Sequence, residues 1–170
     1  MTIPAITEFR DQHSFYSNFH PAAITFEDAA LGGVLTFPSS EHFFQCYKHV
    51  DKPELFHQLR NHPMKGLKAL ARSAPCRPDW ESMTGPGFKV KDQVMLYALV
   101  HKFYQHSDLL VKMMADKGKI LIEGNWWHDN YWGDCMCTNK TGHHPECLHS
   151  GLNRLGFLLM YVREYLSIYQ

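Results

Sequence analysis

The sequence has no excess charge of either sign and no long apolar run. Its 170 residues contain 17 Lys and Arg and 17 Asp and Glu, so the formal net charge is zero. This balance argues against a protein that holds nucleic acid or an acidic membrane by bulk electrostatics. The longest apolar stretch, around Phe157 to Val162, is far too short to cross a bilayer. We therefore expect no membrane association, and any affinity for phosphates has to be local.

The first ten residues lack a basic segment followed by an apolar one, so we expect no secretory signal. Five cysteines is an odd number, and three of them crowd into residues 135–147, which makes a disulfide framework a poor explanation. The expectation is a cytoplasmic protein with reduced thiols. A length of 170 residues with 45% hydrophobic content suits a single domain over residues 1–170, with a Cys- and His-bearing loop insert at 135–150.

Hydrophobic periodicity predicts a compact, mostly helical α+β domain with a small β-sheet of three or more strands. The clearest element is a helix near the C-terminus, where apolar residues step by 3, 4, 3 and 4 from Leu152 to Leu166. Residues 73–87 hold three of the nine prolines and are expected to form a surface loop. The other expected helices cover about residues 41–49, a short segment after Asp51, 64–72, 90–103 and 107–114. The expected strands are 22–26 and 34–37, which form a hairpin, and 119–123.

One predicted helix carries Glu41, Gln45 and Lys48. Positions i, i+4 and i+7 fall on one helix face, so a carboxylate, an amide and an amine line a stripe roughly 10 Å long. A molecule placed across this stripe would meet an acid at one end and an amine at the other. The alternative is a solvated helix face on which Glu41 only complements the helix dipole.

A pair of basic residues lies further along the chain. Lys68 and Arg72 are four residues apart on a predicted helix, and so share a face that could receive a phosphate or pyrophosphate. Most such pairs are only solvated, and that alternative stays open.

The segment Trp126 to Asp134 contains three tryptophans and two acids in nine residues, without a helical or strand period. Large aromatic side chains are costly to leave in water, so such a cluster usually walls a pocket or an interface. A planar heterocycle is the kind of ligand that such a pocket would bind. The alternative is that these rings only pack the loop onto the domain.

Cysteine and histidine gather in the insert that follows. Thiolates and imidazoles at short separations could supply a tetrahedral structural Zn²⁺ site. The spacing C-x-C-x9-C is not that of a standard zinc finger, and free thiols in a polar loop are the alternative. No metal ligand is assigned to the catalytic site. The residues concerned are Cys135, Cys137, His143, His144, Cys147 and His149.

Six ordered sequence blocks resemble the NADAR domain family, also called YbiA-like, from about Phe9 to Leu166. The Ser-Glu-His-x-x-Gln and Tyr-Trp-Gly-Asp segments are the most specific of them. The blocks are Phe9-Arg10, Tyr16-Ser17-Asn18-Phe19, Ser40-Glu41-His42-x-x-Gln45-x-x-Lys48, Val94-Met95-x-x-Ala98-Leu99 with Lys102-Phe103, Asp129-x-Tyr131-Trp132-Gly133-Asp134, and Gly151-x-Asn153-x-Leu155-Gly156-x-Leu158-Leu159-Met160-x-x-Arg163.

The resemblance implies an N-glycosidase, a hydrolase acting on N-glycosyl compounds, with no metal or redox cofactor for catalysis. Family members cleave the bond between a ribose and a nucleobase-like heterocycle. Their substrates are phosphoribosylamino-pyrimidine intermediates of riboflavin biosynthesis, or ADP-ribose attached to guanine in DNA or RNA. By position, the resemblance assigns Glu41, Lys48, Asp129 and Trp132 to the active site, and Arg10, Ser17, Asn18, Gln45, Tyr131 and Asn153 to substrate contacts.

Breaking a C1′–N bond develops positive charge at C1′, so a carboxylate beside the sugar is stabilising and an acid helps the base leave. We expect Asp129 beside the sugar, Glu41 in proton transfer and Trp132 stacked on the departing base or the sugar edge. In the other route, Lys48 attacks the opened C1′ aldehyde and forms a Schiff base.

Two other classes of function compete with the enzyme. A module that binds ADP-ribose or a nucleotide without turnover would be marked by loss of Glu41 or Lys48, and both are present. An interaction or nucleic-acid protein built on the Cys/His segment is the other, and zero net charge counts against its binding a duplex strongly.

Overall fold

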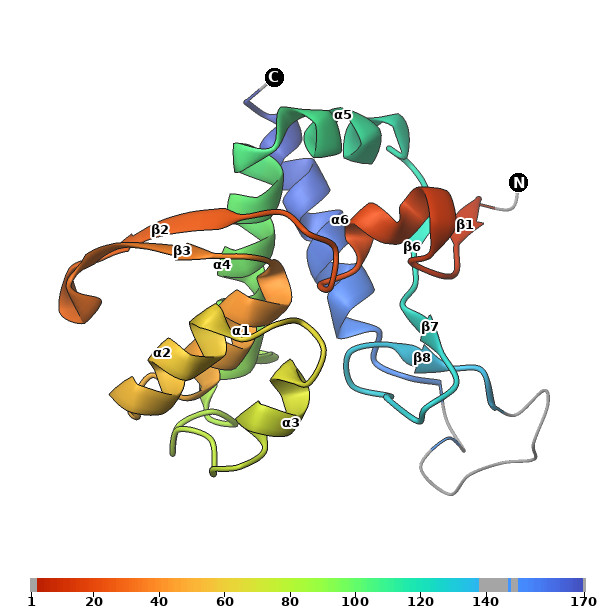
Figure 1. Ribbon diagram of the computed structural model, residues 1–170. Helices are drawn as coiled ribbons and strands as arrows, with labels where there is room; N and C mark the ends of the chain where they lie inside the picture. Colours follow the sequence, from red (N-terminus) through yellow and green to blue (C-terminus); the bar gives the residue numbers. More distant parts are fainter. Residues whose placement is uncertain (1–2, 138–146, 148–149, 170) are drawn as a thin grey trace. The chain divides into compact units, whose positions relative to one another are not determined.

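The computed structural model describes residues 3–137, 147 and 150–169 (Figure 1). The chain divides into two compact units, one made of residues 18–107 and the other of residues 1–17 together with 108–170. Both units combine helices with short strand pairs, which confirms the predicted α+β class. None of the helices in the described ranges has the length and hydropathy that a membrane-spanning segment needs.

The unit of residues 18–107 is built around four helices and two antiparallel strand pairs (Figure 1). In the first pair, β2 and β3 form the predicted hairpin, extended at its turn. Its helices are α1 (Ser40–Lys48), α2 (Pro53–Asn61), α3 (Leu67–Ala71) and α4 (Val90–Gln105), and its strands are β2 (Ile24–Asp28), β3 (Gly33–Phe37), β4 (Met83–Gly85) and β5 (Phe88–Lys89), with the 3-10 turn η2 (Ala29–Leu31) between β2 and β3.

Helix α1 begins where its capping residue requires. The hydroxyl of Ser39 accepts a hydrogen bond from the His42 N–H at 3.3 Å, which satisfies one of the free donors of the first turn. Behind this cap, Phe43 packs edge-on against Phe37 of β3, with ring centroids 5.0 Å apart. The Tyr47 hydroxyl donates to Asp28 at 2.9 Å and so holds the end of β2 against the same helix.

The other unit pairs segments that are distant in sequence. Strand β1 near the N-terminus runs parallel to β6, and β7 runs parallel to β8. Helix α6 buries Leu155, Leu159, Val162 and Leu166, as its periodicity predicts, whereas Leu152 precedes the helix and is exposed. The elements are β1 (Ala5–Ile6), the 3-10 helix η1 (Asp11–Tyr16), α5 (Ser107–Ala115), β6 (Ile120–Leu121), β7 (Gly124–Asn125), β8 (Asp134–Cys135) and α6 (Arg154–Ser167).

Several predicted elements are wrong in extent. The expected sheet of three or more strands is absent from the described residues, where the strands form separate pairs instead. The helix expected at 64–72 covers only Leu67–Ala71, because Gly66 has φ +94° and cannot continue a right-handed helix. The loop expected at 73–87 contains β4, and the strand expected at 119–123 shrinks to β6.

Candidate active-site carboxylates and metal centre

Glu41 is a buried carboxylate in the first turn of α1, only 3% exposed. Gln45, one turn later, donates from Nε2 to Glu41 Oε1 at 2.8 Å. Nζ of Lys68, on α3, lies 3.9 Å from the same oxygen. The solvated-face alternative is therefore wrong for Glu41 and Gln45.

The start of α1 concentrates polar groups around Glu41. The backbone carbonyl of Asn18 accepts the Glu41 N–H at 3.0 Å, which brings Asn18 to the helix N-terminus. Three buried acceptors there have no hydrogen-bond partner among the described residues: Asn18 Oδ1, Ser40 Oγ and Gln45 Oε1. A buried polar atom without a partner costs about 1–3 kcal/mol, so native proteins rarely keep several together without a use for them. A ligand with hydroxyl or amino donors would satisfy them.

Lys48 lies in the last turn of the same helix and is half-buried. It is about 10 Å from Glu41 along the helix axis, as the geometry of seven residues dictates. Its backbone carbonyl accepts the Arg77 N–H at 2.9 Å. Of the three residues predicted to share this face, the structure joins Glu41 to Gln45 and leaves Lys48 at the opposite end.

Lys68 and Arg72 do not behave as a matched basic pair. Lys68 reaches back to Glu41 and also lies over the Phe19 ring, 4.7 Å from its centroid. Arg72 is the exposed C-cap of the short α3. The sequence pattern did not indicate the ion pair between Lys68 and Glu41, because 27 positions separate them.

Lys102 of α4 belongs to one of the family motif blocks, but its spacing did not predict that its amine would be buried. Its side chain is fully buried, and burial lowers the pKa of its amine to about 7. An amine with such a pKa is neutral in a large fraction of molecules near neutral pH, unlike an ordinary lysine.

Asp129 occupies the loop between β7 and β8, and its carboxylate organises the residues that follow. Its Oδ1 accepts the backbone N–H groups of Trp132 at 2.9 Å and Tyr131 at 3.2 Å. The Tyr131 and Trp132 rings meet edge-on, with centroids 5.1 Å apart, and both are half-buried. The three predicted site residues of this segment therefore form one local group.

The side chain of Asn125 binds the backbone of this loop, a role that the sequence did not predict. The residue is fully buried, its Nδ2 donates to the Asp129 carbonyl at 2.7 Å, and its Oδ1 accepts the N–H groups of Asp129 at 3.0 Å and Trp127 at 3.3 Å. Three bonds from one side chain fix a segment that has no regular secondary structure. The only signal in the sequence was an amide directly before the tryptophans.

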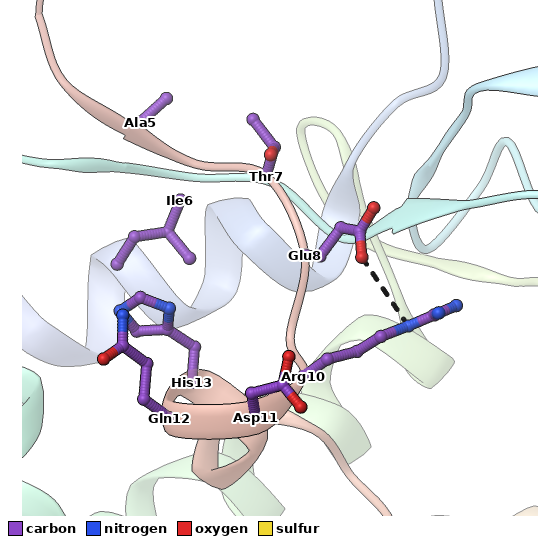
Figure 2. Close-up of a pocket in the computed structure, with 8 residues that line it drawn as sticks. All are labelled: Ala5, Ile6, Thr7, Glu8, Arg10, Asp11, Gln12 and His13. Atoms are coloured by element: carbon purple, nitrogen blue, oxygen red, sulfur yellow. Dashed lines mark ion pairs between the residues drawn. The ribbon is translucent and has the colours of Figure 1, made fainter.

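Two of the predicted substrate contacts, Arg10 and Ser17, take part in local interactions, and their contact with substrate stays a prediction. Arg10 is largely exposed, and its Nε lies 3.7 Å from Oε2 of Glu8. It lines a surface pocket of about 450 Å³ formed by residues 5–8 and 10–13 (Figure 2). Ser17 caps η1 through its N–H, which donates to the Ser14 carbonyl at 3.0 Å.

Asn153 adopts φ +47° just before α6. Its Oδ1 accepts the Glu123 N–H at 3.0 Å, and its Nδ2 donates to the Leu121 carbonyl at 2.9 Å. Both ends of the amide thus bind backbone, so the substrate contact predicted for Asn153 stays a prediction.

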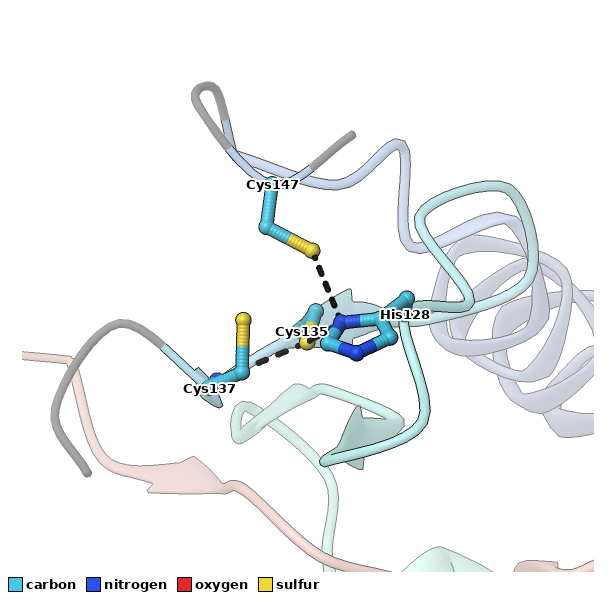
Figure 3. A group of neighbouring side chains, drawn as sticks. All are labelled: His128, Cys135, Cys137 and Cys147. Carbon is cyan, nitrogen blue, oxygen red and sulfur yellow. Dashed lines mark hydrogen bonds between the residues drawn. The ribbon is translucent and has the colours of Figure 1, made fainter. Parts of the chain in front are cut away.

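Four metal-ligating side chains converge beside this loop: His128, Cys135, Cys137 and Cys147 (Figure 3). Against the raising effect of burial, hydrogen bonds from Cys137 hold the pKa of the Cys135 thiol below its usual value. Burial, together with a hydrogen bond that the Cys147 thiol donates to Cys135, raises the pKa of Cys147. The cluster contains the three cysteines named from the sequence, and His128 was missed because only histidines after the cysteines were considered. His143, His144 and His149 lie outside the described residues.

A family model described as NADAR domain matches residues 7–167. The protein named N-glycosidase YbiA of Escherichia coli (strain K12) is 35% identical over 160 residues, which cover 93% of this chain and 84% of that protein. The NMR structure of the E. coli protein YbiA aligns with a TM-score of 0.77 and 32% identity over 99% of this chain and 88% of that one.

A riboflavin biosynthesis protein of Vibrio vulnificus (strain YJ016) is 29% identical over 159 residues. The match covers 92% of this chain and 36% of that protein. All of these similarities extend over nearly the whole length of this chain.

Proposed function

Since the chain belongs to the NADAR domain family, we propose that it hydrolyses the N-glycosidic bond between a ribose C1′ and a nucleobase-like heterocycle. The family predicted from the motifs is confirmed, and the chain is a hydrolase acting on N-glycosyl compounds. The substrate and the roles of individual residues are the proposed part.

The observation that carries the proposal is the buried Glu41 carboxylate with its unpartnered neighbours. A carboxylate that is 3% exposed, fixed by Gln45 and bordered by buried acceptors on Asn18 and Ser40, is expensive to fold unless a ligand uses it. Ribose hydroxyls and exocyclic amino groups supply the donors that these acceptors need. A catalytic carboxylate on a rigid helix is also held in one geometry, as proton transfer requires.

The reaction is a displacement at C1′ by water. The C1′–N bond breaks, its electron pair stays on the base nitrogen, and that nitrogen takes up a proton. Water adds to C1′ and loses a proton to a carboxylate, so free base and free sugar are the products. We assign the proton transfers to Glu41, and the stabilisation of the developing positive charge at C1′ to Asp129, whose Oδ1 is already fixed by two backbone N–H groups.

Trp132 is assigned to stacking on the departing base or the sugar edge, next to Tyr131. Arg10, Ser17, Asn18, Gln45, Tyr131 and Asn153 keep their proposed roles as substrate contacts. The Schiff-base route through Lys48 is separable by experiment. Borohydride trapping during turnover leaves a ribosyl adduct on Lys48 if that route operates, and its absence in active enzyme removes the route.

Two substrate classes fit the proposal. A phosphoribosylamino-pyrimidine of riboflavin biosynthesis is favoured by the name of the Vibrio vulnificus relative. ADP-ribose on guanine in DNA or RNA is the second, and zero net charge predicts that such a substrate is held by its modification, with a shallow salt dependence. The proposal includes a single functional domain over residues 1–170, in the cytoplasm, without a catalytic metal or redox cofactor.

The deciding experiment incubates the protein with each substrate class and follows release of the free base by chromatography and mass spectrometry. Release from one class and not the other assigns the substrate. Binding of ADP-ribose without release from either class would overturn the proposal in favour of a non-catalytic module.

A further inference from the structure

The four side chains of the Cys/His cluster come from different parts of one unit. His128 lies in the loop between β7 and β8, and Cys135 is the last residue of β8. Cys137 follows two positions later, and Cys147 lies ten positions after Cys137 (Figure 3). One ligand atom from each lies within 4.8 Å of all the others. Cys137 and Cys147 are buried, and Cys135 and His128 are half-buried.

The separations match the edges of a metal tetrahedron. With Zn–S bonds of about 2.3 Å and Zn–N bonds of about 2.0 Å, a sulfur and a nitrogen ligand lie about 3.6 Å apart. In the structure, Nδ1 of His128 lies 3.4 Å from Sγ of Cys147 and 3.7 Å from Sγ of Cys135. To coordinate one metal ion, the sulfur atoms would have to move only by a few tenths of an ångström to about 1 Å.

The local backbone is arranged to present these ligands together. Residues i and i+2 of an extended segment point to the same side, so a C-x-C pair leaving β8 directs both thiols one way. His128 adopts φ +68°, an uncommon backbone conformation for a residue other than glycine, and its Nδ1 faces two of the sulfur atoms. The Cys137 N–H donates to Cys135 Sγ at 3.4 Å, an outer hydrogen bond that orients this sulfur atom.

We propose that His128, Cys135, Cys137 and Cys147 bind one structural Zn²⁺ ion. Three thiolates and one imidazole are a soft set that suits zinc and fills all four tetrahedral positions, so no coordination site is left for a reacting water. Binding releases the three thiol protons. The ion would anchor the residue that directly precedes Asp129, and so add a further constraint to a loop that Asn125 also holds through its side chain.

Metal content tests the proposal independently of any glycosidase activity. The full chain, purified under reducing conditions without chelator, should contain about one zinc per chain by mass spectrometry of elements. Cys147→Ser and His128→Asn should each lower the zinc content at least about fivefold, because each removes one of four ligands. Cys76→Ser, which alters a half-buried thiol of the other unit, is the matched control and should keep the full content.

Cobalt substitution reports the geometry without relying on a folded variant. The wild-type chain loaded with Co²⁺ should show the visible bands of tetrahedral cobalt and near-ultraviolet thiolate charge transfer, and Zn²⁺ should displace it. Zinc far below one per chain in the wild type, a disulfide within the cluster of the reduced protein, or equal zinc in Cys147→Ser and wild type would each overturn the proposal.

Discussion

The two carboxylates assigned to catalysis are held in different ways. Glu41 sits on a helix, where the N-cap of Ser39 and the i+4 bond from Gln45 fix it within one regular element. Asp129 sits on a loop, where its own Oδ1 and the amide of Asn125 replace the missing secondary structure. The regular backbone hydrogen bonds of a helix fix the position of a side chain, whereas a loop needs specific side-chain hydrogen bonds to hold each change of backbone direction. The helix-borne group is therefore expected to tolerate changes around it better than the loop-borne group does.

The largest effect is expected from Glu41→Gln. The amide keeps the shape and can still accept from Gln45 through its oxygen, but it cannot carry a proton between water and base. We expect kcat to fall about 1,000-fold, with the free energy of unfolding changed by less than about 1 kcal/mol. Base release and urea unfolding measure the two quantities. Glu54→Gln, on the exposed face of α2, is the control, and full activity of Glu41→Gln would remove this residue from the mechanism.

A pair of substitutions at Asp129 separates its chemical role from its structural one. Asp129→Asn retains an oxygen for the Tyr131 and Trp132 N–H groups but loses the charge, so we expect kcat to fall about 100-fold at nearly unchanged stability. Asp129→Ala loses both and should also destabilise the protein by about 1–2 kcal/mol. Steady-state kinetics with thermal unfolding distinguish the two. Equal stability of the two variants would show that the loop does not depend on the Asp129 oxygen.

Gly133→Ala tests how tightly the loop is packed. A Cβ at this position would lie 2.1 Å from the Glu123 carbonyl oxygen, a backbone atom that cannot swing away. We expect a loss of about 1–3 kcal/mol of unfolding free energy. Gly85→Ala in β4 is the matched control, since nothing lies within 4 Å of its Cβ, and it should change stability by less than about 0.5 kcal/mol. Similar losses in both variants would contradict the packing difference between the regions.

The smallest effect concerns the buried amine of Lys102. Its pKa is about 7 in the folded protein and near 10.5 when exposed, so between these values the unfolded chain binds more protons. Stability therefore rises with pH across this window, and the penalty of burying the charge is fully present below pH 7. Lys102→Met should raise the free energy of unfolding at pH 7 and remove this part of its rise with pH.

Urea unfolding at several pH values from 7 to 10 measures the difference between Lys102→Met and wild type. The exposed Lys65→Met is the control and should follow the wild-type curve. A constant difference across the pH range would show that the Lys102 pKa is not lowered in the folded state.

The sequence predicted the elements that have a helical period, and it did not predict how the short strands pair. The spacing of Glu41 and Gln45 predicted their shared helix face, and the stripe ending at Leu166 predicted α6. Two-residue strands such as β6 are too short to show alternation, so their pairing was not predictable.

Contacts within the sites show the same limit. The family motifs led to Asp129 and Trp132, but nothing local indicated that Asn125 would support them or that Lys68 would approach Glu41. His128 lies with the cysteines and has a left-handed backbone conformation, and neither feature is encoded in a ligand-spacing pattern.

The parallel pairing of β1 with β6 also limits when this part of the fold can form during synthesis. Ala5 pairs with Ile120, so this strand pair cannot form until more than a hundred further residues have been made. Residues 18–107, by contrast, form a continuous unit that contains its own hairpin and helices, so the contacts within it need no part of the chain that is made later. The N-terminal strand has to wait unpaired during that time, and its two-residue length keeps the exposed edge too short to recruit another chain.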